Sequence, residues 1–266
     1  MKPSDFQLTV LGARGSMASA RPELACFGGD SPCYMLRAGE TTLFLDAGSG
    51  MLRAPAAYPG EVMILLSHLH LDHVIGLGMF PAISNPAQRL RIYVPFCRTP
   101  EEAEERMNRL YSPPFWPLKL SAFESRPELL PAPERLRVGE LSIETTVGNH
   151  PNGCLVYRIE YRGRSLVYAT DYEYEKTSFD RLAAFSHGAD LLLYDGQYTE
   201  EEYPARRGFG HSTPQKGLEL LNRSRAKRLL LVHHDPRSTD EMLLEREKEL
   251  PDGLAAYARQ GQVISL

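Results

Sequence analysis

The strongest constraint on this chain is residues 62–78, where a short apolar run leads directly into four potential metal ligands. Residues 62–66, VMILL, have the length and bulk of a β-strand that is buried on both faces. Three histidines and an aspartate follow within six residues: His68, His70, Asp72 and His73. Imidazole nitrogens and carboxylate oxygens together suit borderline divalent ions. The pattern therefore predicts a site for two metal ions at the end of a buried strand, rather than a polar loop with chance histidines.

The size and charge of the chain limit what it can be. It has 266 residues, of which 42% are hydrophobic, so it can bury a sizeable core as one large α/β domain or two small ones. The potential ligands run from position 68 to position 233, which favours a single domain over residues 1–266. The net charge of −4 shows no general attraction to nucleic acid, although it leaves room for a local basic patch.

Cysteine usage and the amino-terminal residues predict a reduced, cytoplasmic compartment. The four cysteines are scattered and form no C-x-x-C pair, so neither a zinc ribbon nor a disulfide scaffold is expected. Residues 1–10 contain one lysine and no apolar core of signal-peptide length, and no run of about eighteen apolar residues occurs. We therefore expect a cytoplasmic protein that does not bind a membrane, with export as the alternative.

The H-x-H-x-D-H spacing at positions 68–73, after an apolar strand, resembles the metal motif of the metallo-β-lactamase-fold hydrolases. The resemblance implies an α/β chain folded as a four-layer αββα sandwich, with the metal site at one edge of the two sheets. It also calls for three more site residues, each after a strand. These are His150 after residues 138–147, Asp171 after residues 165–169, and His233 after residues 228–232.

The resemblance assigns these residues to two divalent ions, expected to be zinc, with manganese or iron as alternatives. His68, His70 and His150 would bind one ion, Asp72, His73 and His233 the other, and Asp171 would bridge them. Asp46, at the end of a predicted strand, would orient the metal-bearing loop by hydrogen bonds, with a helix or turn cap as the alternative. A water shared by two such ions loses its proton near neutral pH, so a bridging hydroxide would be the nucleophile. Asp72 would also orient that hydroxide.

Two further segments resemble ribonuclease Z and its phosphodiesterase relatives. One is the glycine-containing opening at residues 11–16 and 27–31, where two glycines around Arg14 could let backbone amides approach an anion, with an ordinary turn as the alternative. The other is Gly-His-Ser-Thr at 210–213, followed by a helix and a strand that closes on His233. In this pattern His211 contacts the scissile phosphate and would protonate the leaving oxygen. His234 has no counterpart, and either His233 or His234 could be the last ligand. The candidates for substrate binding are Arg14, Ser212, His234 and Arg237.

The resemblance thus implies a dinuclear phosphodiesterase, and one departure from the family narrows its substrate. Ribonuclease Z carries a long basic arm for transfer RNA between the motifs matched by His150 and Asp171, where this chain has only twenty residues. Because RNA affinity depends on phosphate neutralisation, the missing arm and the acidic balance favour a small phosphodiester such as a cyclic nucleotide. The alternatives are a ribonuclease Z-like nuclease, a lactone, thioester or β-lactam hydrolase, and a non-enzymatic sensor on this fold.

Residues 111–135 are rich in proline and contain the only tryptophan, Trp116. Proline excludes a regular helix there, so we expect an ordered loop. It would cover the pocket or meet a second subunit, and a packed loop with neither function is the alternative. Relatives are often dimers, and a homodimer is expected on that ground. Capping boxes predict helix starts at Thr99, Ser212 and Ser238. Other strands are expected at residues 7–11, 34–38, 42–46, 91–94, 155–161, 191–194 and 262–266. Asp195, directly after residues 191–194, is expected to line the site wall or cap a turn and not to be a ligand.

Overall fold

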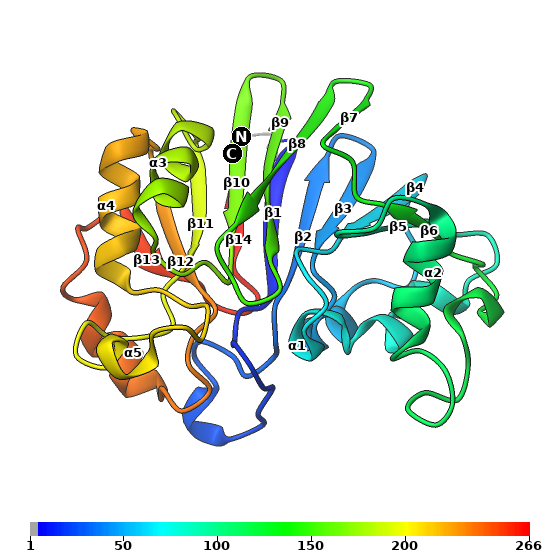
Figure 1. Ribbon diagram of the computed structural model, residues 1–266, viewed down its shortest axis with the longest axis horizontal. Helices are drawn as coiled ribbons and strands as arrows, with labels where there is room; N and C mark the ends of the chain where they lie inside the picture. Colours follow the sequence, from blue (N-terminus) through cyan, green and yellow to red (C-terminus); the bar gives the residue numbers. More distant parts are fainter. Residues whose placement is uncertain (1–4) are drawn as a thin grey trace.

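The chain forms two seven-stranded β-sheets in the computed structural model, which describes residues 5–266 (Figure 1). In spatial order the first sheet contains β14 (Val263–Ser265), β1 (Phe6–Gly12), β2 (Cys33–Ala38), β3 (Thr41–Leu45), β4 (Glu61–Leu65), β5 (Arg89–Val94) and β6 (Glu128–Pro131). The second contains β13 (Ala255–Tyr257), β12 (Leu229–Val232), β11 (Leu191–Asp195), β10 (Arg164–Ala169), β9 (Cys154–Tyr161), β8 (Leu141–Gly148) and β7 (Arg135–Val138). Residues 1–4, part of the segment considered for a leader, lie outside the described residues.

Three hydrophobic clusters define the layers of the fold. One cluster lies between the sheets and contains Leu43 of β3 and Leu193 of β11. A second packs the outer face of the first sheet against α1 (Leu71–Val74) and α2 (Pro100–Asn108). A third packs the outer face of the second sheet against α3 (Lys176–Phe185), α4 (Pro214–Ser224) and α5 (Asp240–Glu247). This is the predicted four-layer αββα sandwich, which is confirmed (Figure 1).

The apolar run at residues 62–66 is a central strand, as predicted. β4 pairs in parallel with β3 on one side and β5 on the other. All five side chains of the run are buried, because helices cover one face of the sheet and the second sheet covers the other. The second sheet has a matching parallel portion, β10 to β13. Parallel strands deliver the residues that follow them to one edge, and that edge carries the candidate site.

The prediction of a strand at residues 138–147 is wrong in its boundaries, because the chain turns at residues 139–140. β7 ends at Val138 and pairs antiparallel with β8, which begins at Leu141. Gly139 makes the turn with φ 59°, a conformation that glycine adopts without cost. Strand-like residues on both sides of a two-residue turn gave the sequence the appearance of one strand. α3 and β13 were not predicted at all.

Residues 111–135 are not a loop throughout, which corrects the prediction for this segment. β6 lies within them and pairs in parallel with β5 at the edge of the first sheet. Trp116 packs edge-on against Tyr111, with ring centroids 5.2 Å apart, and a Cβ on Gly78 would lie 2.4 Å from its indole. The segment is therefore packed against the α1–α2 layer. Its function as a lid or interface stays a prediction.

Two predicted helix caps are displaced by one residue. Thr99 caps α2 as expected, because its side chain accepts a hydrogen bond from the amide of Glu102. The cap of α4 is Thr213 rather than Ser212, with Pro214 at the first helical position. The cap of α5 is Thr239 rather than Ser238. None of the helices formed by residues 5–266 has the length and apolar character needed to cross a bilayer.

Candidate metal centre

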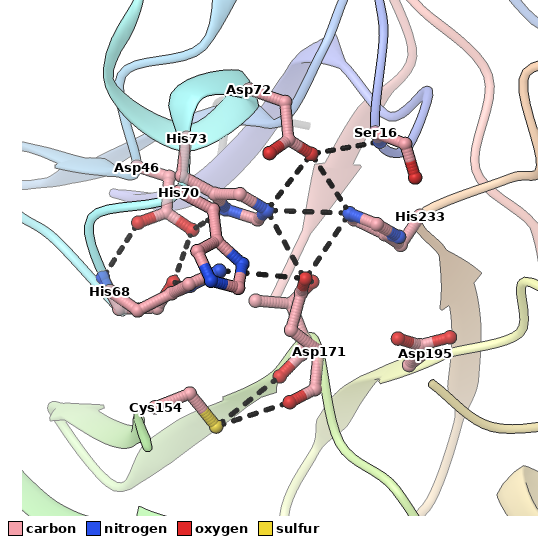
Figure 2. A network of polar contacts seen from close by, with 12 residues as sticks. Ser16, Asp46, His68, His70, Asp72, His73, Cys154, Asp171, Asp195 and His233 are labelled. Carbon is pink, nitrogen blue, oxygen red and sulfur yellow. Dashed lines mark hydrogen bonds and ion pairs between the residues drawn. The ribbon is translucent and has the colours of Figure 1, made fainter. Parts of the chain in front are cut away.

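The seven predicted ligands meet at the edge of the sheets where the parallel strands end. Figure 2 labels all of them except His150. His68 and His70 lie in the loop after β4, Asp72 and His73 in α1, and His150, Asp171 and His233 after β8, β10 and β12. The first four residues therefore come from one sheet and the last three from the other. Their assignment as ligands remains a prediction, but the convergence on which it depends is present in the fold.

Three strand ends place acidic or imidazole side chains in the site by a left-handed backbone turn. The φ angles are 57° at Asp46, 49° at Asp171 and 61° at His233. Asp46 and His233 directly follow β3 and β12, and Asp171 is the second residue after β10. Asp and His tolerate this region better than β-branched residues do, but it still costs energy. After each of these strands the turn directs the polypeptide away from the sheet. In Figure 2 Asp171 and His233 face the α1 side chains.

One cluster of potential ligands contains His68, His70, His150 and Asp171, whose ligand atoms lie within 4.8 Å of one another. His70 Nδ1 is 3.1 Å from His150 Nε2, and His68 Nε2 is 3.6 Å from Asp171 Oδ2. His68 Nε2 is buried and has no hydrogen-bond partner among residues 5–266. A buried imidazole nitrogen without a partner is costly, and a cation between these atoms would satisfy it.

The second cluster contains Asp72, His73 and His233. His73 Nε2 lies 3.3 Å from His233 Nε2, and Asp72 Oδ2 lies 3.3 Å from the first nitrogen and 3.2 Å from the second. Asp171 Oδ1 is 3.2 Å from His73 Nε2, whereas Asp171 Oδ2 faces the first cluster. One carboxylate thus turns an oxygen to each cluster, which is the placement that a bridging ligand requires.

The far nitrogen of each ring in the second cluster is held by an oxygen. His73 Nδ1 donates to Asp46 Oδ2 at 2.7 Å, and His233 Nδ1 donates to Gln197 Oε1 at 2.6 Å. Asp46 therefore has the orienting position predicted for it. Such partners fix the ring orientation and leave Nε2 available to a metal. Gln197 was not predicted, because only the fold brings it to His233.

The rings of the first cluster are oriented in the same way. His150 Nδ1 donates to the carbonyl of Gly210 at 2.8 Å. Ser67 Oγ donates to Asp46 Oδ2 at 2.7 Å, so it can accept from His68 Nδ1, which is 3.0 Å away. Both Nε2 atoms are then acceptors directed into the cluster. The donor set contains five imidazoles and two carboxylates, and one of its imidazole nitrogens has no partner among residues 5–266, so it fits a pair of divalent cations.

The electrostatic balance of the centre favours positive charge. Burial would raise the pKa of Asp72, but His73 and His233 outweigh it and hold that pKa far below its usual range. Burial lowers the pKa of His68 well below its usual value. Burial also acts to lower the pKa of His73, but Asp171 and Asp72 overcome it and raise that pKa well above normal. A proton on His73 thus takes the place that a cation would fill, and metal binding would release it.

His211 is held at the rim of both clusters by a residue that the sequence placed only in the site wall or a turn. His211 Nδ1 donates to Asp195 Oδ2 at 2.8 Å, and the ring stacks on His233 with centroids 4.7 Å apart. Burial lowers the pKa of His211, but Asp195 outweighs it and raises that pKa to about 9. Asp195 also accepts from the amides of Gln197 and Ser212, so it forms the predicted turn as well.

A third grouping of potential ligands is geometrically available. It contains Asp171, Asp195, His211 and His233, with ligand atoms within 4.8 Å of one another. The Nδ1 of His211 is occupied by its bond to Asp195, however, and the first two clusters leave Asp171 and His233 already directed at other atoms. The Nδ1 of His211 is therefore not free to bind a metal, and the function of this residue stays a prediction.

Three of the four candidates for substrate binding are buried in structural contacts, which corrects those predictions. The guanidinium of Arg14 is fully buried and donates to the carbonyls of Gly28, Asp235 and Ser238. Ser212 Oγ bonds to Tyr194. His234 Nε2 donates to the carbonyl of Ala258, and burial lowers the pKa of this ring to about 3. His233 rather than His234 thus faces the clusters, because consecutive residues at a strand end point to opposite sides.

Arg237 is the remaining candidate for substrate binding, and the segment at residues 11–16 was the candidate for binding an anion. The side chain of Arg237 is 59% exposed and pairs with Asp235 at 2.7 Å, so its function in substrate binding stays a prediction. The glycine-containing segment at residues 11–16 was expected to present amides to an anion. The amide of Ser16 donates to Asp72 Oδ2 at 2.8 Å, so this amide bonds to a carboxylate of the centre (Figure 2).

Comparisons with known proteins extend over most of the chain. Residues 41–234 match the family described as "Beta-lactamase superfamily domain". A relative from Mycobacterium leprae (strain TN), named uncharacterized protein ML1173, is 30% identical over 273 residues, covering 98% of this chain and 88% of the relative. Ribonuclease Z of Thermoplasma acidophilum is 25% identical over 254 residues, covering 75% of this chain and 78% of that protein.

Solved structures show the same arrangement of layers. The metallo-beta-lactamase fold protein YhfI from Bacillus subtilis superposes with a TM-score of 0.76 at 21% identity, covering 98% of this chain and 99% of that one. A diphosphatase from the PhnP family superposes with a TM-score of 0.70 at 19% identity, covering 98% of both chains. These likenesses establish the fold.

Proposed function

This chain belongs to the β-lactamase superfamily and has the metallo-β-lactamase fold, and on that basis we propose that it is a dinuclear phosphodiesterase. The family supports a metal-dependent hydrolase, and the two His/Asp clusters suit two divalent ions, with zinc proposed as the metal. The proposed substrates are small phosphodiesters such as cyclic nucleotides. The observation that carries the phosphodiester assignment is the position of His211, which Asp195 holds beside both clusters.

The charge of the substrate explains why His211 favours a phosphodiester. A phosphodiester is an anion before reaction, and further negative charge develops on its oxygens as the leaving group departs. An imidazolium beside the phosphorus stabilises that charge and can protonate the leaving oxygen. Lactones, thioesters and β-lactams are attacked at a neutral carbonyl carbon, so they have less need of a fixed cation in addition to the metals.

In the proposed mechanism, different residues of the centre would bind the metals, orient the attacking water and protonate the leaving group. When bound, two divalent ions supply acidification of water and stabilisation of charge on the reacting phosphate. His68, His70 and His150 would hold one ion, Asp72, His73 and His233 the other, with Asp171 between them. Asp72, fixed by the amide of Ser16, would accept a hydrogen bond from the attacking water and orient it. His211 would donate from Nε2, because its Nδ1 is engaged with Asp195.

The size of the substrate follows from the connection between His150 and Asp171. That connection is a turn and the antiparallel pair β9–β10, which leaves no residues for a separate RNA-binding arm. The net charge of −4 also gives little general attraction for a polyanion. Ribonuclease Z-like RNA processing is the second candidate, because the relative that bears that name is 25% identical. A cytoplasmic homodimer remains a prediction.

A substrate panel on the metal-loaded full chain tests the proposal. Protein loaded with Zn²⁺, Mn²⁺ or Fe²⁺ should cleave bis-p-nitrophenyl phosphate and at least one 2′,3′- or 3′,5′-cyclic nucleotide, and should leave a lactone and a β-lactam intact. An unprocessed transfer RNA distinguishes the second candidate. His68→Ala should abolish cleavage through loss of metal. His211→Asn should lower kcat by about 10²–10⁴-fold while the metal content stays at two ions per chain.

Three results would contradict the proposal. Hydrolysis of the lactone without cleavage of any phosphodiester would move the protein to a different substrate class. Loss of an ion from His211→Asn would make that histidine a ligand rather than a proton donor. A chain that binds none of the three metals would refute the dinuclear centre itself.

A further inference from the structure

Three buried tyrosines lie between the two sheets behind the metal centre. Tyr157 of β9 and Tyr168 of β10 are direct partners in the antiparallel register of those strands. Tyr34 of β2 comes from the other sheet, and its ring centroid is 5.3 Å from that of Tyr168. All three side chains are fully buried. They differ in what their hydroxyl groups contact.

Each hydroxyl has a distinct environment. Tyr168 donates to Asp46 Oδ2 at 2.7 Å, and Tyr157 donates to the carbonyl of Leu66 at 2.7 Å. Both bonds therefore cross from the second sheet to a strand end of the first. The hydroxyl of Tyr34 has no hydrogen-bond partner within the described part of the chain. Only one of three similar side chains is thus connected to a residue that orients a ligand.

Asp46 links Tyr168 to the predicted metal ligand His73, because its carboxylate accepts hydrogen bonds from both side chains. Its Oδ2 accepts from Ser67 Oγ, His73 Nδ1 and Tyr168, each at 2.7 Å, and its Oδ1 accepts from the amide of Ser67 at 2.6 Å. The Ser67 and His73 donors belong to the loop and helix that follow β4. The tyrosine donor comes from the opposite sheet, so it opposes any movement of the carboxylate with that loop.

We propose that Tyr168 is a positioning residue for the metal centre, acting through Asp46 on the imidazole of His73. A carboxylate that receives donors from two sheets cannot rotate without breaking one of them. Its orientation fixes the ring of His73, whose Nε2 lies 3.3 Å from both Asp72 Oδ2 and His233 Nε2. A tilt of that ring would change both separations together. The proposal rests on the metal-binding half of the proposed function and is independent of the substrate.

The three tyrosines supply a matched experiment on the full chain. Tyr168→Phe, Tyr157→Phe and Tyr34→Phe are each measured for Zn²⁺ affinity by competition with a chromophoric chelator, and for thermal stability without metal. Tyr168→Phe should bind Zn²⁺ about tenfold more weakly than the parent, as expected for loss of an outer-shell partner. Tyr157→Phe removes a buried bond of equal length between the same sheets, and should lose stability with Zn²⁺ affinity unchanged. Tyr34→Phe should leave Zn²⁺ affinity unchanged and should keep or raise stability, because it removes a buried hydroxyl that has no partner among the described residues.

A double substitution tests the route through Asp46. If Tyr168 acts through that carboxylate, Asp46→Asn and Tyr168→Phe should be non-additive in their effects on Zn²⁺ affinity. Additive effects would overturn the proposal, as would equal weakening by Tyr168→Phe and Tyr157→Phe, or unchanged affinity in Tyr168→Phe. If the parent protein binds Zn²⁺ but cleaves no phosphodiester, that result would count against the proposed substrate and leave this inference standing.

Discussion

Gly210 offers the sharpest test of how the centre is built, because Gly208 in the same loop is a matched control. The two glycines have a similar φ, but a side chain would contact His150 only at position 210. Gly210 has φ 91° and Gly208 has φ 87°, so an alanine at either position pays a similar backbone penalty, about 1–2 kcal/mol. A Cβ at position 210 would lie 2.0 Å from His150 Nδ1 and 2.4 Å from Pro151 Cδ. A Cβ at position 208 would meet no atom within 4 Å among the described residues.

The consequence for His150 follows from these distances. Ordinary van der Waals contact begins at 3.4 Å, so alanine at position 210 requires a relative movement of about 1.4 Å. The carbonyl of the same residue orients the His150 ring, so the movement also disturbs the hydrogen bond to Nδ1. A misplacement of about 1 Å in a reacting group costs on the order of 10²-fold in rate. Metal affinity should fall by about 10–100-fold.

Paired measurements separate strain from displacement. Gly208→Ala and Gly210→Ala are compared for thermal stability without metal, Zn²⁺ affinity and turnover of bis-p-nitrophenyl phosphate. Both variants should lose stability through the backbone penalty, and Gly210→Ala should lose more because its Cβ clashes with His150 and Pro151. Only Gly210→Ala should lose Zn²⁺ affinity and turnover. Equal metal affinity in the two variants would show that the position of His150 does not depend on this glycine, and would refute the reasoning.

Three further outcomes are expected. Arg14→Met should lower the free energy of unfolding by about 3 kcal/mol, because it leaves buried carbonyls unpaired. Arg237→Met should lower it by less, because the Arg237 side chain is 59% exposed, although its partner Asp235 is only 6% exposed; denaturant unfolding measures both. Asp190 accepts from Lys227 and the amide of Ser165, and these donors outweigh burial and lower its pKa, so its stabilisation is present above the ordinary carboxyl pKa and is lost as the pH falls below it. The stability difference between the parent and Asp190→Asn should therefore shrink in acid. Free Zn²⁺ at one hundred times its dissociation constant should stabilise the protein by about 2.7 kcal/mol, which thermal unfolding with and without EDTA would show.

Much of this architecture could be predicted because the apolar strands have strong local signals. Residues 62–66 are apolar without interruption, and only a strand covered on both faces accepts such a run. The ligands after β4 lie next to one another in sequence, so their meeting needs no knowledge of the fold. His150, Asp171 and His233 could be proposed only because a family resemblance supplied their long-range pairing. The left-handed backbone at Asp171 and His233 and the far-nitrogen partners of His150 and His233 have no sequence signal.

The errors have a common physical origin in groups whose partners are distant. Arg14 lies between two glycines and was expected to bind an anion. Its Nη1 instead donates to two carbonyls more than two hundred residues away, and its Nε and Nη2 donate to the carbonyl of Gly28. Asp195 was assigned to the site wall or a turn, and its bond to His211 crosses sixteen positions. The α4 cap was displaced because Ser212 and Thr213 both suit that position. Pro214 at the first helical position decides for Thr213.

A metal centre at this site would also help to hold the two halves of the sandwich together at their open edge. Asp72 and His73 come from the first sheet and Asp171 and His233 from the second, and their acceptor atoms face one another at 3.2–3.3 Å. Carboxylates and imidazole lone pairs at that separation repel unless positive charge lies between them, and the raised pKa of His73 reflects this demand, since Asp171 and Asp72 overcome the effect of burial. A single proton meets it only in part, because one hydrogen can satisfy few of these acceptors. Divalent ions would satisfy them and draw both sheets to the same point, so metal binding and the packing of this edge should be coupled.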